Sequence, residues 1–383
     1  MTLKLTLNVN KIWATYFFSK IGYMLFANFV YGKMTTLGDT SRYFGGRTAW
    51  ESDWFYSSTS MMDSFASLSG SLMGPYLGNL PFMTLSFLGV YYPLSKITLS
   101  KRQLYFVLIM LSFPSFGVWT SIASKEAVGV FYLGVILAGY IDLYERDPIK
   151  NKALFLLAVY LMLVFKAQYS IGVLALFLFT WLGRRFSLNS GLKLFTFVVA
   201  VAIGLLALYL ARDIIDSLSK MMPAHFRKDA GSTRENAIWV EQYDFFKNAA
   251  YGMYIAFVGP TVHEALSKPT HMLAWIESMV ILGAFGMLTL KYILTVAIRS
   301  KFNVMFICGF SLAAFWILLV HYPFGALNPG SAIRYRESFY AFLVILFFFM
   351  YRNAIVPFST RRYSRSVNDY HDESGYGRPG SVT

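Results

Sequence analysis

Hydrophobic residues along this chain gather in long, nearly unbroken runs that polar segments separate. A run of about 20 apolar residues is long enough for an α-helix to cross the hydrocarbon core of a bilayer. The strands of a membrane barrel would instead alternate apolar and polar positions, and the sequence has no such pattern. We therefore expect an all-α polytopic integral membrane protein with about ten transmembrane helices. They are expected at residues 12–32, 76–95, 103–122, 127–143, 193–211, 271–297, 302–321 and 338–351, with two short helices inside 153–183 that meet at residues 166–169.

Two long polar segments, residues 33–76 and 212–270, interrupt this pattern and are expected to be outer loops. The second is the larger, and its amphipathic stretch 245–258 is expected to rest on the membrane surface and to cover the site as a lid. Residues 1–351 are thus predicted to form a single polytopic membrane domain. Residues 352–383 are rich in Arg, Ser, Gly and Tyr and lack apolar periodicity, which indicates a disordered cytoplasmic tail.

Basic residues give the expected orientation, because Lys and Arg gather in the short cytoplasmic loops of membrane proteins. The short loops at 96–102, 144–152, 184–193 and 299–301 are all basic, and so is the C-terminal tail. If both termini are cytoplasmic, every one of these segments falls on the inner side. The same segments account for much of the net charge of +14, so we do not expect a nucleic-acid partner.

Composition supports the membrane assignment and narrows the chemistry. Hydrophobic residues make up 56 % of the chain and charged residues 14 %, which excludes an ordinary soluble globular protein. The single cysteine, Cys308, lies in an apolar run and is expected to pack as a small apolar side chain, so an intramolecular disulfide and a thiolate metal site are excluded. The five histidines are scattered and form no His-x-x-x-His pair. We expect neither a metal nor a cofactor.

Polar groups suited to catalysis collect on the predicted outer face, where five separate segments deliver them. Ionisable groups at membrane depth are costly and usually mark a site or a pathway. The candidate catalytic residues are Asp39, Glu126, His225 and His263. The candidate substrate-binding residues are Arg42, Lys125, Lys166, Gln168, Arg334, Arg336 and Glu337. The alternative interpretation is a set of hydrated loop ends that never meet.

Two arginines stand out in this set, because positive charge is unusual on the non-cytoplasmic side. Arg334 and Arg336 follow a Pro-Gly dipeptide, which predicts an irregular turn. We expect Arg334 in that turn and Arg336 at the start of the last span, so that both converge with Lys125 on one phosphate or carboxylate. Glu337 would orient one of the two arginines. Snorkelling of both arginines at a helix end is the plainer alternative.

The sequence contains no nucleophile elbow, no P-loop and no metal motif. Cations near a membrane surface can neutralise a departing phosphate or diphosphate, and a base can take the proton from an acceptor hydroxyl. Asp39 or a histidine can serve as that base. Lipid-linked phosphosugars are available at a membrane surface, so the residue set favours sugar transfer from a lipid-linked donor.

Three short motifs resemble those of a known family. The segment Gly38-Asp39-Thr40-Ser41-Arg42-Tyr43 resembles the Gly-Asp-x-x-x-Tyr in the first outer loop of bacterial polysaccharide polymerases. The segment Ser124-Lys125-Glu126, after Pro114 and Trp119, resembles their Pro…Trp…Lys-(Asp/Glu) stretch. Asn328-Pro329-Gly330, which leads to Arg334-Tyr335-Arg336, resembles their last outer loop, where Arg-x-Arg precedes the final span. The matches cover about twenty of the 383 residues.

The resemblance implies an O-antigen or exopolysaccharide repeat-unit polymerase of the Wzy type, within the broad class of polyprenyl-dependent membrane glycosyltransferases. Such an enzyme transfers glycan from an undecaprenyl-diphosphate carrier to a lipid-linked repeat unit at the outer face of the bacterial inner membrane. Its expected partners are the undecaprenyl-diphosphate-linked oligosaccharide, membrane lipid and a chain-length regulator.

Three alternatives stay open on the sequence. A membrane glycosyltransferase that adds one sugar from a polyprenyl-phosphate donor needs the same base and the same phosphate holders. A polysaccharide flippase or transporter is expected to carry polar groups along a path through the bilayer, whereas here they lie on one face. A membrane acyltransferase would favour a histidine in or near a span, and His321 at the end of the ninth span keeps that alternative open.

Overall fold

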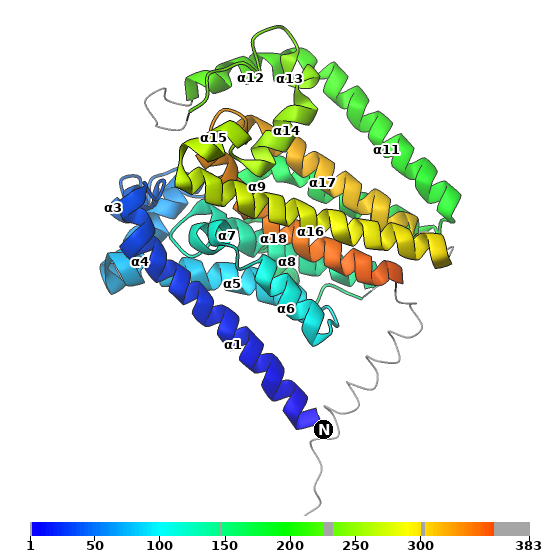
Figure 1. Cartoon of the computed structure of the whole chain (residues 1–383), viewed down its shortest axis with the longest axis horizontal. Coiled ribbons are helices and arrows are strands. Elements are labelled where there is room, and N and C mark those ends of the chain that lie inside the picture. The colour runs from blue at the N-terminus through cyan, green and yellow to red at the C-terminus, as the bar shows by residue number, and fades with distance from the viewer. Residues whose placement is uncertain (1, 146, 226–232, 300–302, 356–383) are drawn as a thin grey trace, which may run out of the picture.

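The computed structural model describes residues 2–145, 147–225, 233–299 and 303–355, in which all regular structure is helical (Figure 1). The helices are α1 (Thr2–Phe26), η1 (Ala27–Tyr31), α2 (Gly32–Met34), α3 (Thr40–Gly45), α4 (Ser58–Leu77), α5 (Leu80–Ser95), α6 (Lys101–Met110), α7 (Pro114–Trp119), α8 (Lys125–Glu145), α9 (Lys152–Lys166), η2 (Ala167–Tyr169), α10 (Ser170–Arg185), α11 (Ser190–Leu210), α12 (Arg212–His225), α13 (Asp244–Lys247), α14 (Ala249–Val258), α15 (Val262–Ser267), α16 (Pro269–Arg299), α17 (Val304–Gly325) and α18 (Pro329–Ile355).

Five stretches in the described part of the chain are long and apolar enough to cross a membrane, as expected for a helical membrane protein. They are Lys125–Glu145, Lys152–Arg185, Ser190–Leu210, Pro269–Val296 and Val304–Gly325. The count of ten spans goes beyond these five and stays a prediction. Residues 352–355 of the predicted disordered tail are helical, because α18 continues to Ile355, and residues 356–383 lie outside the described residues.

The prediction that two short helices meet at residues 166–169 is confirmed. Lys166 leaves the helical region, with φ −152° and ψ 64°, and η2 joins α9 to α10 there. Contacts with α8 show that α9 runs antiparallel to α8 and that α10 runs parallel to it. These contacts pair Phe155 with Gly139 and Phe165 with Tyr132 for α9, and Thr180 with Tyr140 and Arg184 with Tyr144 for α10.

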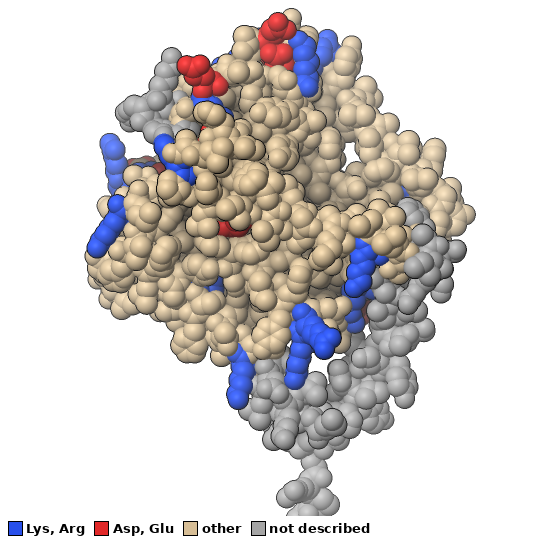
Figure 2. Space-filling model, in the orientation of Figure 1, with Lys and Arg blue, Asp and Glu red and all other residues tan. Residues whose placement is uncertain are grey.

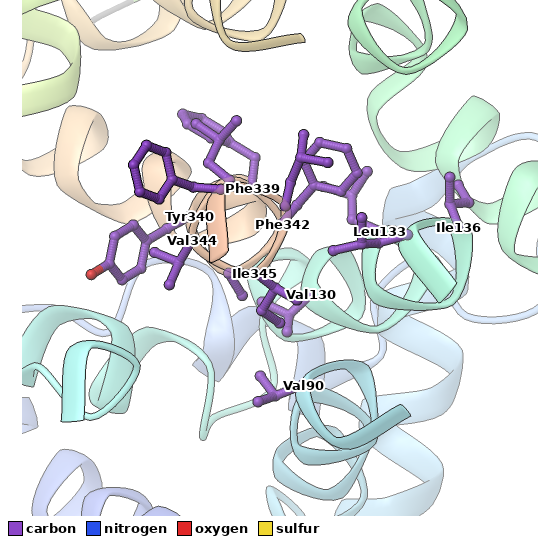
Figure 3. Packing of buried hydrophobic residues seen from close by; sticks show 14 of the residues in the cluster. Val90, Val130, Leu133, Ile136, Phe339, Tyr340, Phe342, Val344 and Ile345 are labelled. Carbon is purple, nitrogen blue, oxygen red and sulfur yellow. The ribbon is translucent and has the colours of Figure 1, made fainter. Parts of the chain in front are cut away.

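α8 is the central helix, and almost all of its residues are buried because α5, α9 and α18 pack around it. It approaches α5 so closely that a Cβ atom on Gly134 would lie 1.9 Å from the carbonyl oxygen of Gly89. Small residues allow such close approach where lipid provides no hydrophobic force between helices. On its other side, apolar side chains of α8 and α18, among them Leu133 and Phe342, fill the space between the two helices (Figure 3).

The span predicted at 103–122 is not one continuous helix. α6 ends at Met110, and α7 begins at Pro114, whose missing N–H and fixed φ suit the first position of a helix. Three carbonyl groups freed by the break accept hydrogen bonds from tyrosine hydroxyls. The pairs are Tyr340 with Met110, Tyr16 with Leu111 and Tyr23 with Ser112. Because buried backbone groups must be paired, these tyrosines allow the chain to break inside the bundle.

The segment between α7 and α8, residues 120–124, is buried and non-helical, and it positions the start of α8. The side chain of Asn79 accepts a hydrogen bond from the N–H of Ala123 at 2.7 Å. The hydroxyl of Thr40 donates to the carbonyl of Ala123 at 3.1 Å. Thr40 is the first residue of α3, so this bond ties the predicted first outer loop to the N-terminus of α8. That predicted loop is itself largely helical, since it contains α3 and most of α4.

Residues 212–270, predicted as a polar loop, contain α12 to α15. The stretch 245–258 was expected to rest on the membrane surface; it contains α14, one face of which packs into the bundle against α17 and α18 while Tyr251 and Tyr254 are exposed. Gly252 lies so close to the ring of Tyr322 that a Cβ atom there would be 1.8 Å from it. α14 is too short to span a bilayer and almost entirely apolar, so it is stabilised by burying one face against other helices.

Arg234 fastens this region to the end of α17. Its Nε and Nη2 atoms donate to the two carboxylate oxygens of Glu264 at 2.7 and 2.6 Å. Its Nη1 atom donates to the carbonyl of Ala326 at 2.8 Å. Burial of Glu264 raises the pKa of its carboxyl, but the charge of Arg234 and the N–H of Thr261 outweigh burial and lower that pKa. The pair is thus charged at neutral pH and holds α15 close to α17.

The two ends of the bundle differ in charge. In Figure 1, α3, α12 and α15 lie toward the upper left, whereas the N-terminus and the C-terminal end of α18 lie below and to the right. On the face shown in Figure 2, a broad band of mostly uncharged surface separates Lys and Arg side chains at the lower edge from charges of both signs at the upper end. This distribution is the one expected if the band faces lipid.

Candidate active site

Six charged side chains from separate parts of the chain meet near the N-terminus of α8. They are Asp39, Arg42, Lys125, Glu126, Lys166 and Arg334, and we refer to them as the charged cluster. Asp39 and Arg42 come from the start of α3, Lys125 and Glu126 begin α8, Lys166 ends α9, and Arg334 lies in the second turn of α18. The structure thus brings together six of the eleven candidate site residues.

Arg334 is the centre of the charged cluster. Its Nη2 atom lies 2.9 Å from Oδ2 of Asp39, and its Nε atom lies 3.4 Å from Oε2 of Glu126. The rings of Trp119 and Tyr335 flank the guanidinium, with centroids 5.6 and 5.5 Å from its central carbon. The side chain is only 13 % exposed. Arg334 therefore does not snorkel into water, because carboxylates and aromatic rings hold it in place.

Gly38 leaves the space that the guanidinium occupies. A Cβ atom at this position would lie 2.3 Å from Nη1 of Arg334, much closer than non-bonded atoms allow. Gly38 also has a positive φ of 59°, which favours glycine over residues with a Cβ atom. Both observations give a physical reason for the glycine in the Gly38-Asp39 pair.

The two lysines of the charged cluster have no carboxylate within ion-pair distance in the described residues. Lys125 donates to the hydroxyls of Ser58 and Thr59 at 2.8 and 3.0 Å. Lys166 lies over the ring of Tyr335, with its Nζ atom 4.1 Å from the centroid. Neutral hydroxyls and an aromatic face hold a cation without cancelling its charge. Both ammonium groups therefore remain able to bind an anion.

The charged cluster has an excess of positive charge, because four cations face the two carboxylates of Asp39 and Glu126. Burial of Asp39 raises the pKa of its carboxyl, but Arg334, Arg42 and Lys125 outweigh burial and hold that pKa below its ordinary value. Asp39 is therefore ionised at neutral pH. The excess of two formal charges, four minus two, suits a ligand with two negative charges such as a phosphate or a diphosphate.

The two carboxylates of the charged cluster differ in access. The side chain of Asp39 is 45 % exposed, whereas that of Glu126 is fully buried. Oε2 of Glu126 holds Arg334, and its Oε1 atom has no hydrogen-bond partner in the part of the chain that the structure describes. Asp39 can therefore meet a substrate directly, whereas Glu126 contacts Arg334 from the buried side and holds it in place.

Arg336 and Glu337 do not belong to the charged cluster, so the prediction that both arginines converge on one anion is wrong. α18 begins at Pro329, so no irregular turn is present and both arginines are helical. Fully buried Arg336 lies 3.2 Å from Oε1 of Glu277 and 2.8 Å from Oε1 of Glu337. It also donates to the carbonyl of Phe257 at 2.9 Å. Arg336 thus joins α14, α16 and α18 and holds no free position for a ligand.

The remaining predicted site residues lie outside the charged cluster. Gln168 lies in η2, and its side chain makes no hydrogen bond within the described ranges. His263 is exposed on α15 and likewise has no polar partner there. The side chain of His225 is outside the described part of the structure. His321 on α17 is buried, with Nε2 3.0 Å from the carbonyl of Ala256 on α14, and its ring packs against Phe339 of α18.

Sequence reasoning missed the role of Glu277 and Lys20, which are buried with Arg336 and Glu337. Oε2 of Glu277 accepts a hydrogen bond from the N–H of Ser115 at 3.0 Å, which ties the start of α7 to α16. Lys20 donates to the carbonyl of Thr120 at 3.1 Å. A charged residue inside a predicted span was the available signal for both, since such residues nearly always have a buried partner.

A scan against protein-family models and searches of curated proteins and of solved structures find no match to this chain.

Proposed function

We propose that this protein is a polysaccharide polymerase, which transfers glycan from an undecaprenyl-diphosphate carrier to a lipid-linked repeat unit. One observation carries the proposal: the three motifs that resemble those of polysaccharide polymerases meet at Arg334. Asp39 of the first motif and Glu126 of the second both contact it, across 295 and 208 residues of sequence. Chance matches to short motifs would have no reason to converge in space.

The cations supply the electrostatic part of the proposed reaction. A diphosphate leaving group develops negative charge as its bond to the sugar breaks, and fixed cations stabilise that charge without having to reorganise. Arg334 keeps its Nη1 atom free of carboxylates, and Lys125 and Lys166 are not neutralised by an ion pair in the described residues. These three groups are the proposed diphosphate holders, with exposed Arg42 at the rim.

Asp39 is the proposed general base, because it is the accessible carboxylate of the charged cluster. Its Oδ2 atom pairs with Arg334. Its Oδ1 atom makes only a long contact, 3.9 Å, with exposed Arg42, so it can meet an acceptor hydroxyl. Glu126 is the proposed positioning residue, which holds the guanidinium of Arg334 from the buried side. His225 and His263 have no support as bases from the described contacts.

In the proposed step, the hydroxyl oxygen of the acceptor repeat unit attacks the anomeric carbon of the donor glycan. The new glycosidic C–O bond forms while the C–O bond to undecaprenyl diphosphate breaks, and the diphosphate leaves with the electron pair. The hydroxyl proton passes to Asp39. The step needs no oxidant and no nucleotide. We place it at the outer face of the bacterial inner membrane, with both termini cytoplasmic and a chain-length regulator as a partner.

A glycosyltransferase that adds one sugar from a polyprenyl-phosphate donor is the second candidate, since the charged cluster suits either leaving group. The deciding experiment uses purified protein in detergent micelles with lipid-linked repeat units of the producing cell as the substrate. A polymerase yields products that grow by whole repeat units, a single-sugar transferase yields an increase of one sugar, and a transporter yields no covalent product. Mass spectrometry of the glycan distinguishes the three.

Two variants link the assay to the charged cluster. Arg334→Ala should reduce product formation at least a hundredfold, since it removes the central cation and leaves Asp39 and Glu126 without their partner. Arg212→Ala, which alters a partly exposed arginine on α12, should leave product formation unchanged. Full-length products from Arg334→Ala would refute the proposed role of the charged cluster.

A further inference from the structure

A pair of tryptophans in the loop between α3 and α4 has no role in the chemistry described above. The rings of Trp50 and Trp54 stack with centroids 5.6 Å apart and an angle of 15° between their planes. Trp50 is 62 % exposed, and Trp54 is half-buried beneath it. The outer face of the stack is therefore a flat, open aromatic surface.

The backbone of this loop is held in a fixed shape. The carboxylate of buried Asp63 accepts hydrogen bonds from the N–H and the hydroxyl of Thr48, at 3.0 and 2.6 Å. The hydroxyl of Ser64 accepts from the N–H of Trp50 at 2.9 Å. Trp50 has a positive φ of 60°, which is costly for a bulky residue. Strained positions that surrounding contacts enforce are found preferentially at ligand-binding sites.

The tryptophan pair lies a few residues before the segment that contacts the charged cluster. Lys125 donates hydrogen bonds to Ser58 and Thr59, the first residues of α4. Ser58 is four residues after Trp54, so their Cα atoms are at most about 14 Å apart. A glycan whose diphosphate binds at Lys125 would therefore pass close to the tryptophans.

We propose that the Trp50–Trp54 stack is a carbohydrate subsite, which holds the sugar chain of the lipid-linked substrate. The C–H groups on one face of a sugar ring carry partial positive charge and are attracted to the electron-rich face of an indole. Arg47, Glu51 and Ser52 are exposed and lie within three residues of Trp50 in sequence, so they offer donors and acceptors for sugar hydroxyls. The inference rests on the proposed function, because that function names glycan as the substrate.

The competing role for exposed tryptophans is an anchor in the lipid interface. The sequence neighbours of Trp50 argue for the glycan, because the exposed guanidinium of Arg47 and carboxylate of Glu51 are available for hydrogen bonds within the same short loop. Contact with lipid chains would remove water from these charged groups, which costs free energy. A sugar, which is apolar on its ring faces and polar at its edges, matches both parts of the surface.

The test measures glycan binding without the lipid carrier. The probe is the oligosaccharide repeat unit of the producing cell, released from its carrier so that it lacks the diphosphate. Isothermal titration uses the full chain in phosphatidylcholine nanodiscs. Trp50→Ala should weaken binding about tenfold, and Trp50→Phe should restore most of it. The matched control is Tyr56→Ala, which removes a 72 % exposed aromatic ring from the same loop and should not change binding.

Two outcomes would overturn the subsite. One is equal binding of the oligosaccharide by the wild type, Trp50→Ala and Trp54→Ala. The other is strong quenching of Trp50 fluorescence by brominated phosphatidylcholine, measured as the difference between wild type and Trp50→Phe, because it would put Trp50 in lipid.

The two proposals fail separately. If the tryptophan variants lose oligosaccharide binding but no covalent product forms in the micelle assay, the subsite stands and the polymerase assignment falls. If polymer forms and the tryptophan variants make it at wild-type rate and length, the polymerase assignment stands and the subsite falls.

Discussion

Arg334 and Arg336 are two residues apart on α18, yet their side chains serve different parts of the molecule. Arg334 pairs with Asp39 and Glu126, whereas fully buried Arg336 pairs with Glu277 on α16. Residues i and i+2 of an α-helix point about 200° apart around the axis, so the two side chains cannot share a target. One Arg-x-Arg motif therefore contains a site arginine and a structural arginine.

The first prediction separates these two roles. Arg336→Met should destabilise the protein by about 3–5 kcal/mol, because it leaves Glu277 and Glu337 buried without their cation. Arg334→Met should lose activity and should also lose some stability, because it leaves buried Glu126 without its cation, but less than Arg336→Met, which leaves two buried carboxylates unpaired. Thermal unfolding in detergent measures the stability of both variants, and the micelle assay measures their activity. A stable, inactive Arg336→Met protein would instead put Arg336 at the site.

The second prediction concerns the glycine beside the guanidinium. Gly38→Ala should displace Arg334 and force a positive φ on alanine, so activity should fall at least tenfold. Gly45→Ala is the matched control, since no atom lies within 4 Å of a Cβ atom there. Initial rates of polymer formation measure the effect. Equal rates for the two variants would show that the position of Arg334 does not matter.

The third prediction uses the lowered pKa of Asp39. Because its pKa in the folded protein is below the ordinary value of 3.8, the pairing with Arg334 contributes stability above that value and loses it as the pH falls through the folded pKa. The stability difference between wild type and Asp39→Asn should thus stay constant from about pH 7 to about pH 5, begin to fall near about pH 4 and disappear only below the folded pKa. Asp39 is partly exposed, so the difference should be less than about 1 kcal/mol.

The same variant, Asp39→Asn, is also expected to change activity. Asp39→Asn keeps the size of the side chain but cannot accept a proton, so product formation should fall by a factor of about a hundred or more at neutral pH. Thermal unfolding at several pH values and initial rates measure the two effects. A stability difference that already disappears near pH 6 would contradict the lowered pKa.

The fourth prediction tests the insertion of α14 into the bundle. Gly252→Ala would place a Cβ atom 1.8 Å from the ring of Tyr322, so α14 must shift and stability should drop by about 1–3 kcal/mol. Gly283→Ala on α16 meets no atom within 4 Å and should be neutral or slightly stabilising. Thermal unfolding compares the two. If α14 rested on the membrane surface, the two substitutions would behave alike.

The fifth prediction tests the topology. In a Cys308→Ala background, cysteines at Ser217 on α12 and at Lys247 on α13 should react with a membrane-impermeant reagent added outside the cell. Cysteines at Lys101 and Ser187 should react only after the membrane is opened. Cys308→Ala itself should stay active, because Cys308 is buried among apolar residues of α17. The reverse labelling pattern would invert the predicted orientation.

Several features followed from the sequence alone, because they depend on local properties of the chain. The apolar runs determined that the protein is helical, and Lys166 within an apolar stretch marked the break between α9 and α10. The motifs around Asp39, Lys125 and Arg334 identified the charged cluster. Burial of Cys308 followed from its apolar neighbours and is confirmed. In each case the side chains nearby in sequence decide the outcome.

Other features were decided only by tertiary packing. Whether Pro329 begins a helix or lies in a turn depends on which apolar residues α18 can bury. Because the helix begins at Pro329, Arg336 points into the interior. The insertion of α14 depends on the ring of Tyr322, 70 residues away in sequence from Gly252. The break after Met110 depends on hydroxyls from other helices. Sequence periodicity reports which faces are apolar, but the partner that pairs each buried polar group is known only once the helices are packed.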